Sequence, residues 1–221
     1  MYNKYIKRLL DLVAALTLLT LAIPLLLVIA IAVKLSSPGP VIFTQERSGI
    51  NGTKFKMFKL RTMDKNNSVS DASGEDQITG IGRFLRAFSL DEIPQLVNVV
   101  RGDMSFIGPR PWITDYYDHM DSTQRHRYDV RPGITGIAQV YGRNNLSIHD
   151  KIKYDLRYVS HIGLREDLKV IFLTIQAVVS RDGQEMGKGG IHKELDILRS
   201  QLNNSEDLQD DSGNNILETA I

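Results

Sequence analysis

Residues 12–33 read LVAALTLLTLAIPLLLVIAIAV, a run of 22 residues without a charged side chain. As one continuous helix the run is about 33 Å long, which is close to the thickness of the hydrocarbon core of a bilayer. It is longer than the core of a signal peptide, and no small-residue cleavage site follows it before Lys34. We therefore expect the segment to reside in a membrane. The alternative is a helix buried in a protein core.

Two features of this segment argue against a simple membrane span. Pro24 lies in its middle and removes a backbone hydrogen bond, so a kink is expected there. Basic residues lie on both sides, among them Arg8 and Lys34, whereas an excess on one side orients a spanning helix. We predict a re-entrant (monotopic) helix over residues 1–35 that enters and leaves by the same leaflet, with a tilted span as the alternative. A hydroxyl such as that of Thr20 would satisfy the backbone group that Pro24 leaves free.

The rest of the chain is expected to form a cytosolic domain over residues 36–181, followed by a flexible acidic tail over residues 182–221. Short strands are predicted at residues 41–45 and 54–60, joined by an Asn-Gly turn at residues 49–52. The fold class is therefore α+β and mostly helical, with a small β-hairpin. Helices are predicted at residues 81–88, 90–100, 113–128, 148–160 and 164–179.

The predicted helix at residues 164–179 has an apolar stripe, which includes Leu168, Phe172 and Ile175. Packing against a core is the simpler explanation of such a stripe. The alternative is a helix that lies on the face of a membrane.

Composition excludes several classes of protein. The hydrophobic fraction is 42%, the charged fraction 24% and the formal net charge +1, which is typical of a folded chain. The small net charge argues against binding of nucleic acid through bulk positive charge. Without cysteine the chain has no disulfide, thiolate zinc site or cysteine nucleophile, and a reducing compartment is expected. The five histidines lack metal-ligand spacing, and none of the common nucleotide-binding glycine motifs is present.

The chemically richest stretch is SLDEIPQLVNVVRGDMSFIGPRP, residues 89–111. Ser89 and Glu92 have the spacing of a helix capping box, so a purely structural role is the first interpretation of Glu92. A helix start also attracts phosphate, but two adjacent carboxylates, Asp91 and Glu92, would repel it unless a cation lay between them. Mg²⁺ is the expected cation, because it prefers one or two carboxylates together with phosphate oxygens.

Several basic residues are available to bind phosphate. Arg110 lies between Pro109 and Pro111, which restrict its backbone, and a guanidinium group pairs with phosphate through two parallel hydrogen bonds. Scattered arginines more often serve solubility, yet this one lies on a rigid loop near the acidic pair. The remaining candidates are Lys59, Arg61, Arg83, Arg86, Arg131 and Arg143.

Four stretches of the chain resemble the bacterial sugar transferases of the small monotopic phosphoglycosyl transferase type. They are the apolar helix with SSPGPVIFTQERSGINGTKFKMFKLRTM, then IGRFLRAFSLDEIPQLVNVVRGDMSFIGPRP, then RPGITGIAQVYGRN and lastly LREDLKVIFLTI. They cover about residues 1–180 in the family's order. One position departs from the family: the residue before the membrane-helix proline is often serine, and here it is Ile23.

The resemblance implies an enzyme that transfers a sugar 1-phosphate from a UDP-sugar to undecaprenyl phosphate, releases UMP and requires Mg²⁺. It implies that Asp91 is the nucleophile that forms an aspartyl-phosphosugar. Glu92 would assist through the metal or by taking a proton from the lipid phosphate. Lys59, Arg86, Arg110 and Arg143 match substrate-binding positions, and the metal would be held by Asp91 and Asp167.

The resemblance also implies a place in the cell: the bacterial inner membrane, with the catalytic domain on the cytoplasmic face, at the start of polysaccharide or glycoconjugate assembly. The expected partners are the UDP-sugar, undecaprenyl phosphate and membrane lipids, with no nucleic acid and with homodimer formation open. The alternative function is a membrane-anchored protein without catalysis, whose basic strand at residues 54–59 binds anionic lipid.

Overall fold

The computed structural model describes residues 1–64, 78–142, 146–179, 197, 198 and 200. The predicted substrate-binding Arg143 and the tail over residues 182–221, apart from three of its positions, lie outside the described residues. The described part is mostly helical with two small sheets, which confirms the predicted α+β class.

The N-terminal elements are η1 (Tyr2–Ile6), α1 (Lys7–Ser36), β1 (Ile42–Ser48), η2 (Ile50–Gly52), β2 (Lys54–Leu60), α2 (Gly80–Ala87), η4 (Leu90–Glu92) and α3 (Gln95–Arg101). The others are β3 (Ser105–Ile107), α4 (Asp115–Asp118), α5 (Ser122–Arg125), η5 (His126–Tyr128), β4 (Gly133–Thr135), α6 (Ile137–Gly142), α7 (Ile148–Ser160) and α8 (Leu164–Val179).

Helix α1 is continuous through Pro24 and is the one described helix that is long and apolar enough to cross a membrane, counted together with η1. Most of its leucines are exposed, so the alternative of a buried core helix is wrong. The Thr20 hydroxyl donates to the carbonyl of Leu16 at 2.9 Å. The prediction that Thr20 serves the group freed by Pro24 is therefore wrong, because its hydroxyl has a partner one turn earlier.

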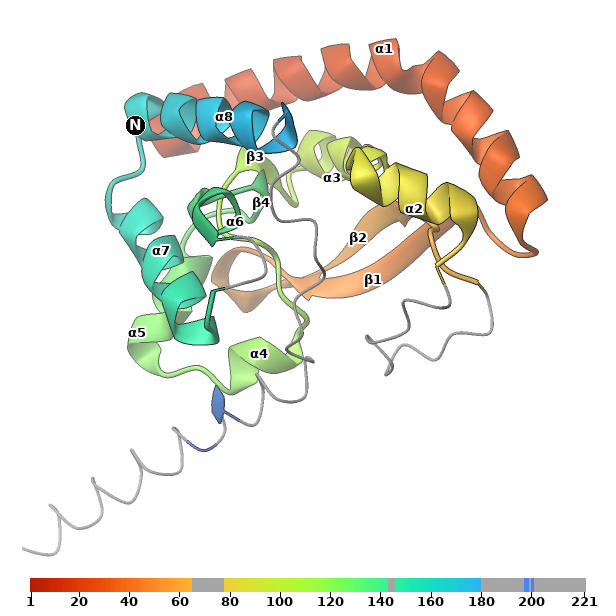
Figure 1. Ribbon diagram of the computed structural model, residues 1–221. Helices are drawn as coiled ribbons and strands as arrows, with labels where there is room; N and C mark the ends of the chain where they lie inside the picture. Colours follow the sequence, from red (N-terminus) through yellow and green to blue (C-terminus); the bar gives the residue numbers. More distant parts are fainter. Residues whose placement is uncertain (65–77, 143–145, 180–196, 199, 201–221) are drawn as a thin grey trace, which may run out of the picture.

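Both ends of α1 are bound to the same body of the protein. At its start, Arg8 donates from Nη2 to the carbonyl of Val100 at 2.9 Å, at the C-terminal end of α3. At its end, the buried Arg61 donates to the carbonyl of Ser37 at 2.6 Å and to that of Pro38 at 2.8 Å. In Figure 1 the orange, C-terminal part of α1 descends toward the β1–β2 hairpin.

The β1–β2 hairpin is antiparallel and runs in register from Ile42 opposite Leu60 to Ser48 opposite Lys54. Its turn is the predicted Asn-Gly pair, because Asn51 and Gly52 both have positive φ, 53° and 74°. Strand β1 extends three residues beyond the predicted end at Gln45. The hairpin thus carries Lys59, near the end of β2, back toward the exit of α1.

A second sheet was not predicted. Strands β3 and β4 pair in parallel, with Ser105 opposite Gly133 and Ile107 opposite Thr135. A Cβ on Gly133 would collide with the backbone of Gly108, so only glycine permits this close approach. Strands of three residues are too short to show the alternating pattern that predicts a strand from the sequence.

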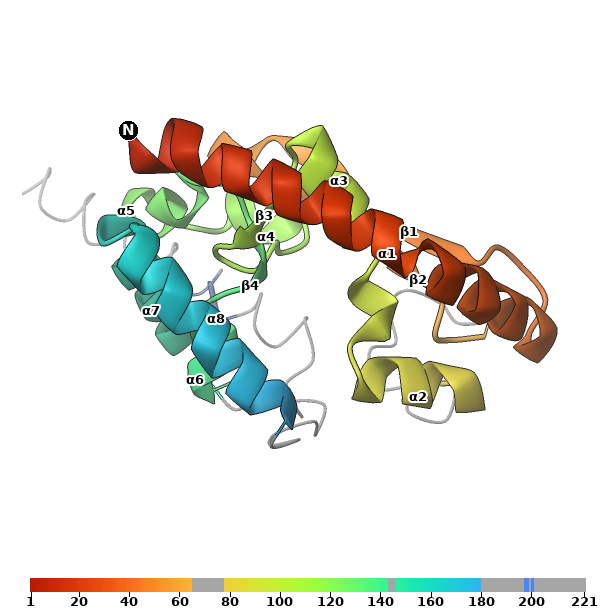
Figure 2. The same ribbon diagram turned by 90° about the horizontal axis from the view of Figure 1, so that it is seen from above.

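Helices α7 and α8 have the predicted bounds, whereas the helix predicted at residues 113–128 is broken into α4, α5 and η5. The break occurs at Asp121, which caps α5 by accepting from the N–H of Gln124 at 2.8 Å. The stripe on α8 does not pack in the core, because Leu168, Phe172 and Ile175 are exposed. Figure 1 shows α8 along the same side of the molecule as α1, and Figure 2 shows the two helices apart when seen from above.

Helix α2 packs closely on the backbone of Thr62, and two of its glycines form a matched pair that tests this contact. A Cβ on Gly82 would collide with the backbone of Thr62, whereas a Cβ on Gly80 would meet nothing. Gly82→Ala is therefore expected to lower the free energy of unfolding by about 1–3 kcal/mol through overpacking. Gly80→Ala, the control, is expected to change it little. Denaturant unfolding in detergent measures both, and equal effects of the two substitutions would contradict the close contact.

Candidate active site

Asp91 and Glu92 lie in the short helix η4 between α2 and α3. Ser89, just before it, has left-handed backbone angles (φ 55°, ψ 22°) and its side chain makes no capping bond. The predicted capping box is therefore wrong. The Glu92 carboxylate binds cations on other elements, and these charge-assisted bonds are stronger than a bond to its own helix start.

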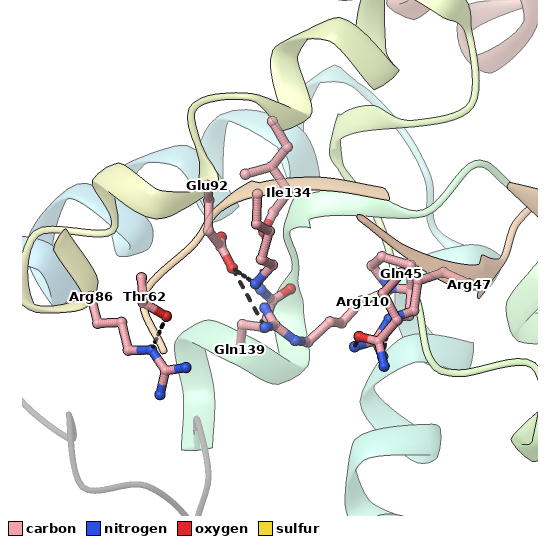
Figure 3. A network of polar contacts seen from close by, with 10 residues as sticks. Gln45, Arg47, Thr62, Arg86, Glu92, Arg110, Ile134 and Gln139 are labelled. Atoms are coloured by element: carbon pink, nitrogen blue, oxygen red, sulfur yellow. Dashed lines mark hydrogen bonds and ion pairs between the residues drawn. The ribbon is translucent and has the colours of Figure 1, made fainter. Parts of the chain in front are cut away.

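Glu92 joins two predicted substrate-binding residues. Its Oε1 accepts from Lys59 Nζ at 2.7 Å and from Arg110 Nη2 at 3.5 Å. Figure 3 shows Glu92 and Arg110 pointing toward one another. Burial alone would raise the pKa of Glu92, but the attraction of Lys59 and Arg110 outweighs it and lowers the pKa to about 2. Glu92 is thus firmly ionised, and its charge is neutralised by the protein.

Asp91 is in the opposite situation. The residue is 8% exposed, and its carboxylate makes no hydrogen bond or ion pair with the side chains of the described residues. Burial raises the pKa of Asp91, Lys59 and Arg86 lower it in part, and the neighbouring charge of Glu92 raises it further. A buried carboxylate that no described side chain neutralises could act as a nucleophile toward an electrophile.

Arg86 acts electrostatically on Asp91. Its Nε donates to the hydroxyl of Thr62 at 2.9 Å (Figure 3). Burial lowers the pKa of Arg86 and the charge of Asp91 raises it, which places the guanidinium within electrostatic reach of the carboxylate. Lys59, Arg86 and Arg110 are thus gathered around the Asp91–Glu92 pair, as the sequence predicted.

The loop of residues 109–112, Pro-Arg-Pro-Trp, is held at every carbonyl by a donor from another part of the chain. Because two of its four residues are prolines without an N–H, the carbonyls are the main backbone groups that can fix it. The donors, in the order of the carbonyls, are Gly133 N (3.0 Å), Arg127 Nη2 (2.8 Å), Arg47 Nη1 (3.3 Å) and Ser48 N (3.0 Å). Arg110 is therefore presented to Glu92 from a rigid backbone.

Arg47 is a further cation near Arg110 that was not predicted from the sequence as a site residue. Its Nη2 donates to Gln45 Oε1 at 2.5 Å and its Nη1 to the Pro111 carbonyl, so these partners are neutral. Burial, and then repulsion by Arg110, lowers the pKa of Arg47 to about 10. A second guanidinium without a counter-charge strengthens the attraction of this site for anions. An isolated arginine on a predicted strand is usually a solvent-exposed residue, so its position alone does not indicate a binding role. The only sequence feature that could have indicated one is that Arg47 lies in a stretch that resembles the family.

The structure does not bring every predicted residue to this site. Asp167 accepts from Lys7 Nζ at 2.6 Å, from the Tyr2 hydroxyl at 2.7 Å and from the Tyr158 hydroxyl at 2.6 Å. No contact within the described part of the chain joins it to Asp91. Three other candidates also lie elsewhere: Arg61 holds the end of α1, Arg131 donates to the Gly102 carbonyl, and Arg83 is exposed.

The described residues offer an adjacent carboxylate pair for a magnesium ion but do not form a closed metal site. Among the described residues, no group of three or more histidine, aspartate and glutamate side chains could hold a metal. Asp91 offers unshared carboxylate oxygens, and Glu92 is next to it but already bound by two cations. This pair suits an ion that arrives with a phosphate-bearing substrate, which supplies the other oxygens, and not a closed protein site.

Comparisons with known proteins show the family of the chain. A model described as bacterial sugar transferase matches residues 2–181. The chain belongs to the bacterial sugar transferase family. The UDP-glucose:undecaprenyl-phosphate glucose-1-phosphate transferase of Caulobacter vibrioides is 44% identical over 188 residues, which cover 80% of this chain and 70% of that protein.

Two further relatives widen the comparison. The uncharacterized sugar transferase EpsL of Bacillus subtilis is 40% identical over 183 residues, which cover 80% of this chain and 89% of that protein. The UDP-N-acetylgalactosamine-undecaprenyl-phosphate N-acetylgalactosaminephosphotransferase of Aeromonas hydrophila is 37% identical over 189 residues, covering 81% and 45%. This sugar transferase is therefore an enzyme, a phosphoglycosyl transferase, and the alternative of a lipid-binding protein without catalysis is set aside.

The two buried aspartates of the sugar transferase are expected to respond oppositely to the same substitution. Burial raises the pKa of both, but Asp155 is paired with Arg127 whereas Asp91 has no ion-pair partner among the described residues. The ionised form of Asp91 therefore costs stability at neutral pH, and that cost disappears as the pH falls through its folded-state pKa. Asp91→Asn is therefore expected to leave the melting temperature unchanged or to raise it. The control is Asp155→Asn, which leaves the buried Arg127 without its counter-charge and is expected to cost about 3–5 kcal/mol. A comparable loss in both variants would contradict an unpaired Asp91.

Proposed function

We propose that this sugar transferase moves a sugar 1-phosphate from a UDP-sugar to undecaprenyl phosphate and releases UMP, by way of a covalent aspartyl-phosphosugar. The observation that carries the proposal is the unpaired carboxylate of Asp91, next to a Glu92 whose charge is already balanced. The names of the Caulobacter and Aeromonas relatives describe transferases that act on a UDP-sugar and undecaprenyl phosphate.

The reaction divides into two displacements at one phosphorus atom. An oxygen of Asp91 attacks the phosphorus that bears the sugar, the bond from that phosphorus to the bridging oxygen breaks, and the bridging oxygen leaves with its electron pair as part of UMP. An oxygen of undecaprenyl phosphate then attacks the same phosphorus, and the Asp91 carboxylate leaves. A covalent intermediate separates a water-soluble donor from a lipid acceptor, so the two need not be bound at once.

The cations and Glu92 have distinct tasks in these steps. Lys59, Arg86 and Arg110 neutralise the charge of the phosphates as the bonds change. A carboxylate with a pKa of about 2 is a poor proton acceptor, so the expected role of Glu92 in taking a proton is not favoured. Glu92 instead holds Lys59 and Arg110 in place before the substrate arrives.

Mg²⁺ is the proposed cofactor, held by Asp91 and Glu92 together with substrate oxygens. When bound, it neutralises charge on the phosphoryl group that is transferred. Asp167 is not proposed as a ligand, because both of its oxygens are engaged by Lys7 and two tyrosines. Arg143 stays a predicted substrate-binding residue.

The anchor is proposed to be re-entrant, in the cytoplasmic leaflet of the bacterial inner membrane, with a bend at Pro24. The support is that Arg8 and Arg61 bind the two ends of α1 to one catalytic body. A straight span of about 30 Å would place those ends on opposite sides of the bilayer. The exposed stripe of α8 supports a helix that lies on the same membrane face.

The covalent intermediate predicts a sugar-phosphate adduct on the enzyme. Mixed with UDP-glucose, UDP-galactose or UDP-N-acetylgalactosamine and Mg²⁺ but no lipid acceptor, the enzyme is expected to release up to one UMP per chain. Intact-mass spectrometry should then show the added sugar phosphate, and peptide mapping should place it on Asp91. Asp91→Asn is expected to lose both signals, because an amide is a poor nucleophile.

The matched control for this experiment is Asp118→Asn, which changes an exposed aspartate on α4 and is expected to keep both signals. Steady turnover with lipid acceptor but without an adduct or a UMP burst would mean direct transfer between the substrates. That result would remove the covalent mechanism and leave the transferase activity standing.

The re-entrant anchor predicts that both ends of α1 face the cytoplasm. The chain contains no cysteine, so a single introduced thiol reports its own position. Tyr5→Cys and Leu35→Cys replace residues that are 62% and 82% exposed. In intact cells a membrane-impermeant maleimide is expected to label neither thiol, and to label both once the membrane is opened. Labelling of one of the two in intact cells would establish a span.

A further inference from the structure

A fully buried ion pair lies behind the Pro-Arg-Pro-Trp loop and has no part in the proposed chemical steps. Arg127 is 1% exposed and Asp155 is 2% exposed. Arg127 donates to Asp155 Oδ2 from Nη2 at 2.6 Å and from Nε at 3.1 Å. The pair joins η5 to α7, two elements that are distant from Asp91 in the sequence.

The same guanidinium contacts the loop at two points, the backbone of Arg110 and the ring of Trp112. Its Nη2 donates to the Arg110 carbonyl at 2.8 Å, and its Cζ lies 3.9 Å from the centre of the Trp112 ring. Trp112 in turn packs on Tyr116, with ring centres 4.9 Å apart. One guanidinium thus fixes the backbone at residue 110 and the ring two residues later.

Stability alone is a weak reason for such a pair. Two charges lose their hydration when they are buried, and apolar residues of similar volume often stabilise a protein as well or better. Apolar residues could not, however, donate to the Arg110 carbonyl while packing on an indole ring. Lysine keeps the charge, but its ammonium group is not planar and has one donor nitrogen, whereas Arg127 donates from both Nε and Nη2.

We propose that Arg127 and Asp155 are positioning residues that hold the Pro-Arg-Pro-Trp loop so that Arg110 meets Glu92 and the substrate phosphates. The inference rests on the proposed function for its effect on the reaction. Its structural part, the ordering of the loop, stands on the contacts of Arg127 with Arg110 and Trp112.

A double-mutant cycle with Arg110 separates positioning from general stability. Arg110→Ala is expected to lower kcat/KM for UMP release by about 10²–10³-fold. Arg127→Lys is expected to lower it by about 10²-fold, because a small displacement of a catalytic group is costly. In the Arg110→Ala background, Arg127→Lys should cost less than about 3-fold, since nothing is left to position. Equal losses in both backgrounds would overturn the proposal.

A second variant keeps the test valid if Arg127→Lys is unstable. Arg127→Met combined with Asp155→Leu replaces the whole pair with apolar side chains, and it is expected to melt within a few degrees of the unaltered enzyme. It is nevertheless expected to be about 10²-fold slower in UMP release. Full activity in this folded double variant would overturn the proposal. Arg125→Lys, an exposed arginine two residues away, is the control and is expected to change neither property.

Trp112 provides a readout that needs no turnover. It is the single tryptophan of the chain, so its fluorescence reports the loop alone. Acrylamide is expected to quench it more strongly in Arg127→Lys than in Arg125→Lys, and equal quenching would overturn the ordering of the loop. If the unaltered enzyme releases no UMP from any of the three UDP-sugars, the proposed function fails, and the quenching measurement still decides whether Arg127 orders the loop.

Discussion

The ion pairs of Glu92 with Lys59 and Arg110 are the contact on which the active site depends. They join three separate parts of the chain, namely strand β2, helix η4 and the Pro-Arg-Pro-Trp loop. They also make the two adjacent carboxylates, Glu92 and Asp91, different in charge pairing. Because Glu92 is neutralised by Lys59 and Arg110 while no described side chain pairs with Asp91, Asp91 is the carboxylate that we propose as the nucleophile. Two equally solvated carboxylates would have no such difference in character.

The membrane anchor follows a related rule, in which charged groups tie an apolar helix to a polar body. Arg61 binds backbone carbonyls where α1 ends, Arg8 binds those where α3 ends, and Lys7 is paired with Asp167. Burying the charges of Arg61 and Lys7 is costly, and the bonds of Arg61 to carbonyls and of Lys7 to a carboxylate offset part of that cost. The apolar helix and the rest of the described domain are therefore one unit, which puts Asp91, the proposed nucleophile, at a defined place relative to the helix.

Much of the architecture was accessible from the sequence. The apolar run, the Asn-Gly hairpin and the bounds of α7 and α8 are local patterns, and the structure confirms them. The gathering of Lys59, Arg86 and Arg110 around Asp91 and Glu92 was also predicted, through the resemblance to the family. The predictions for Ser89 and Thr20 were wrong because both relied on spacing along the chain alone. The left-handed backbone of Ser89 prevents its capping bond, and the Thr20 hydroxyl donates to the carbonyl of Leu16 instead.

By itself the sequence determined the periodic elements and the residue types of the site, because helix and strand patterns depend on neighbours along the chain. Only the tertiary structure decided that Glu92 is paired while Asp91 is not, that Asp167 belongs to another network, and that the stripe of α8 is exposed. It also revealed the parallel β3–β4 pairing, Arg47 and the Arg127–Asp155 pair. These depend on contacts between residues many positions apart, and such contacts, with the burial that sets a carboxylate's pKa, leave no periodic signal in the sequence.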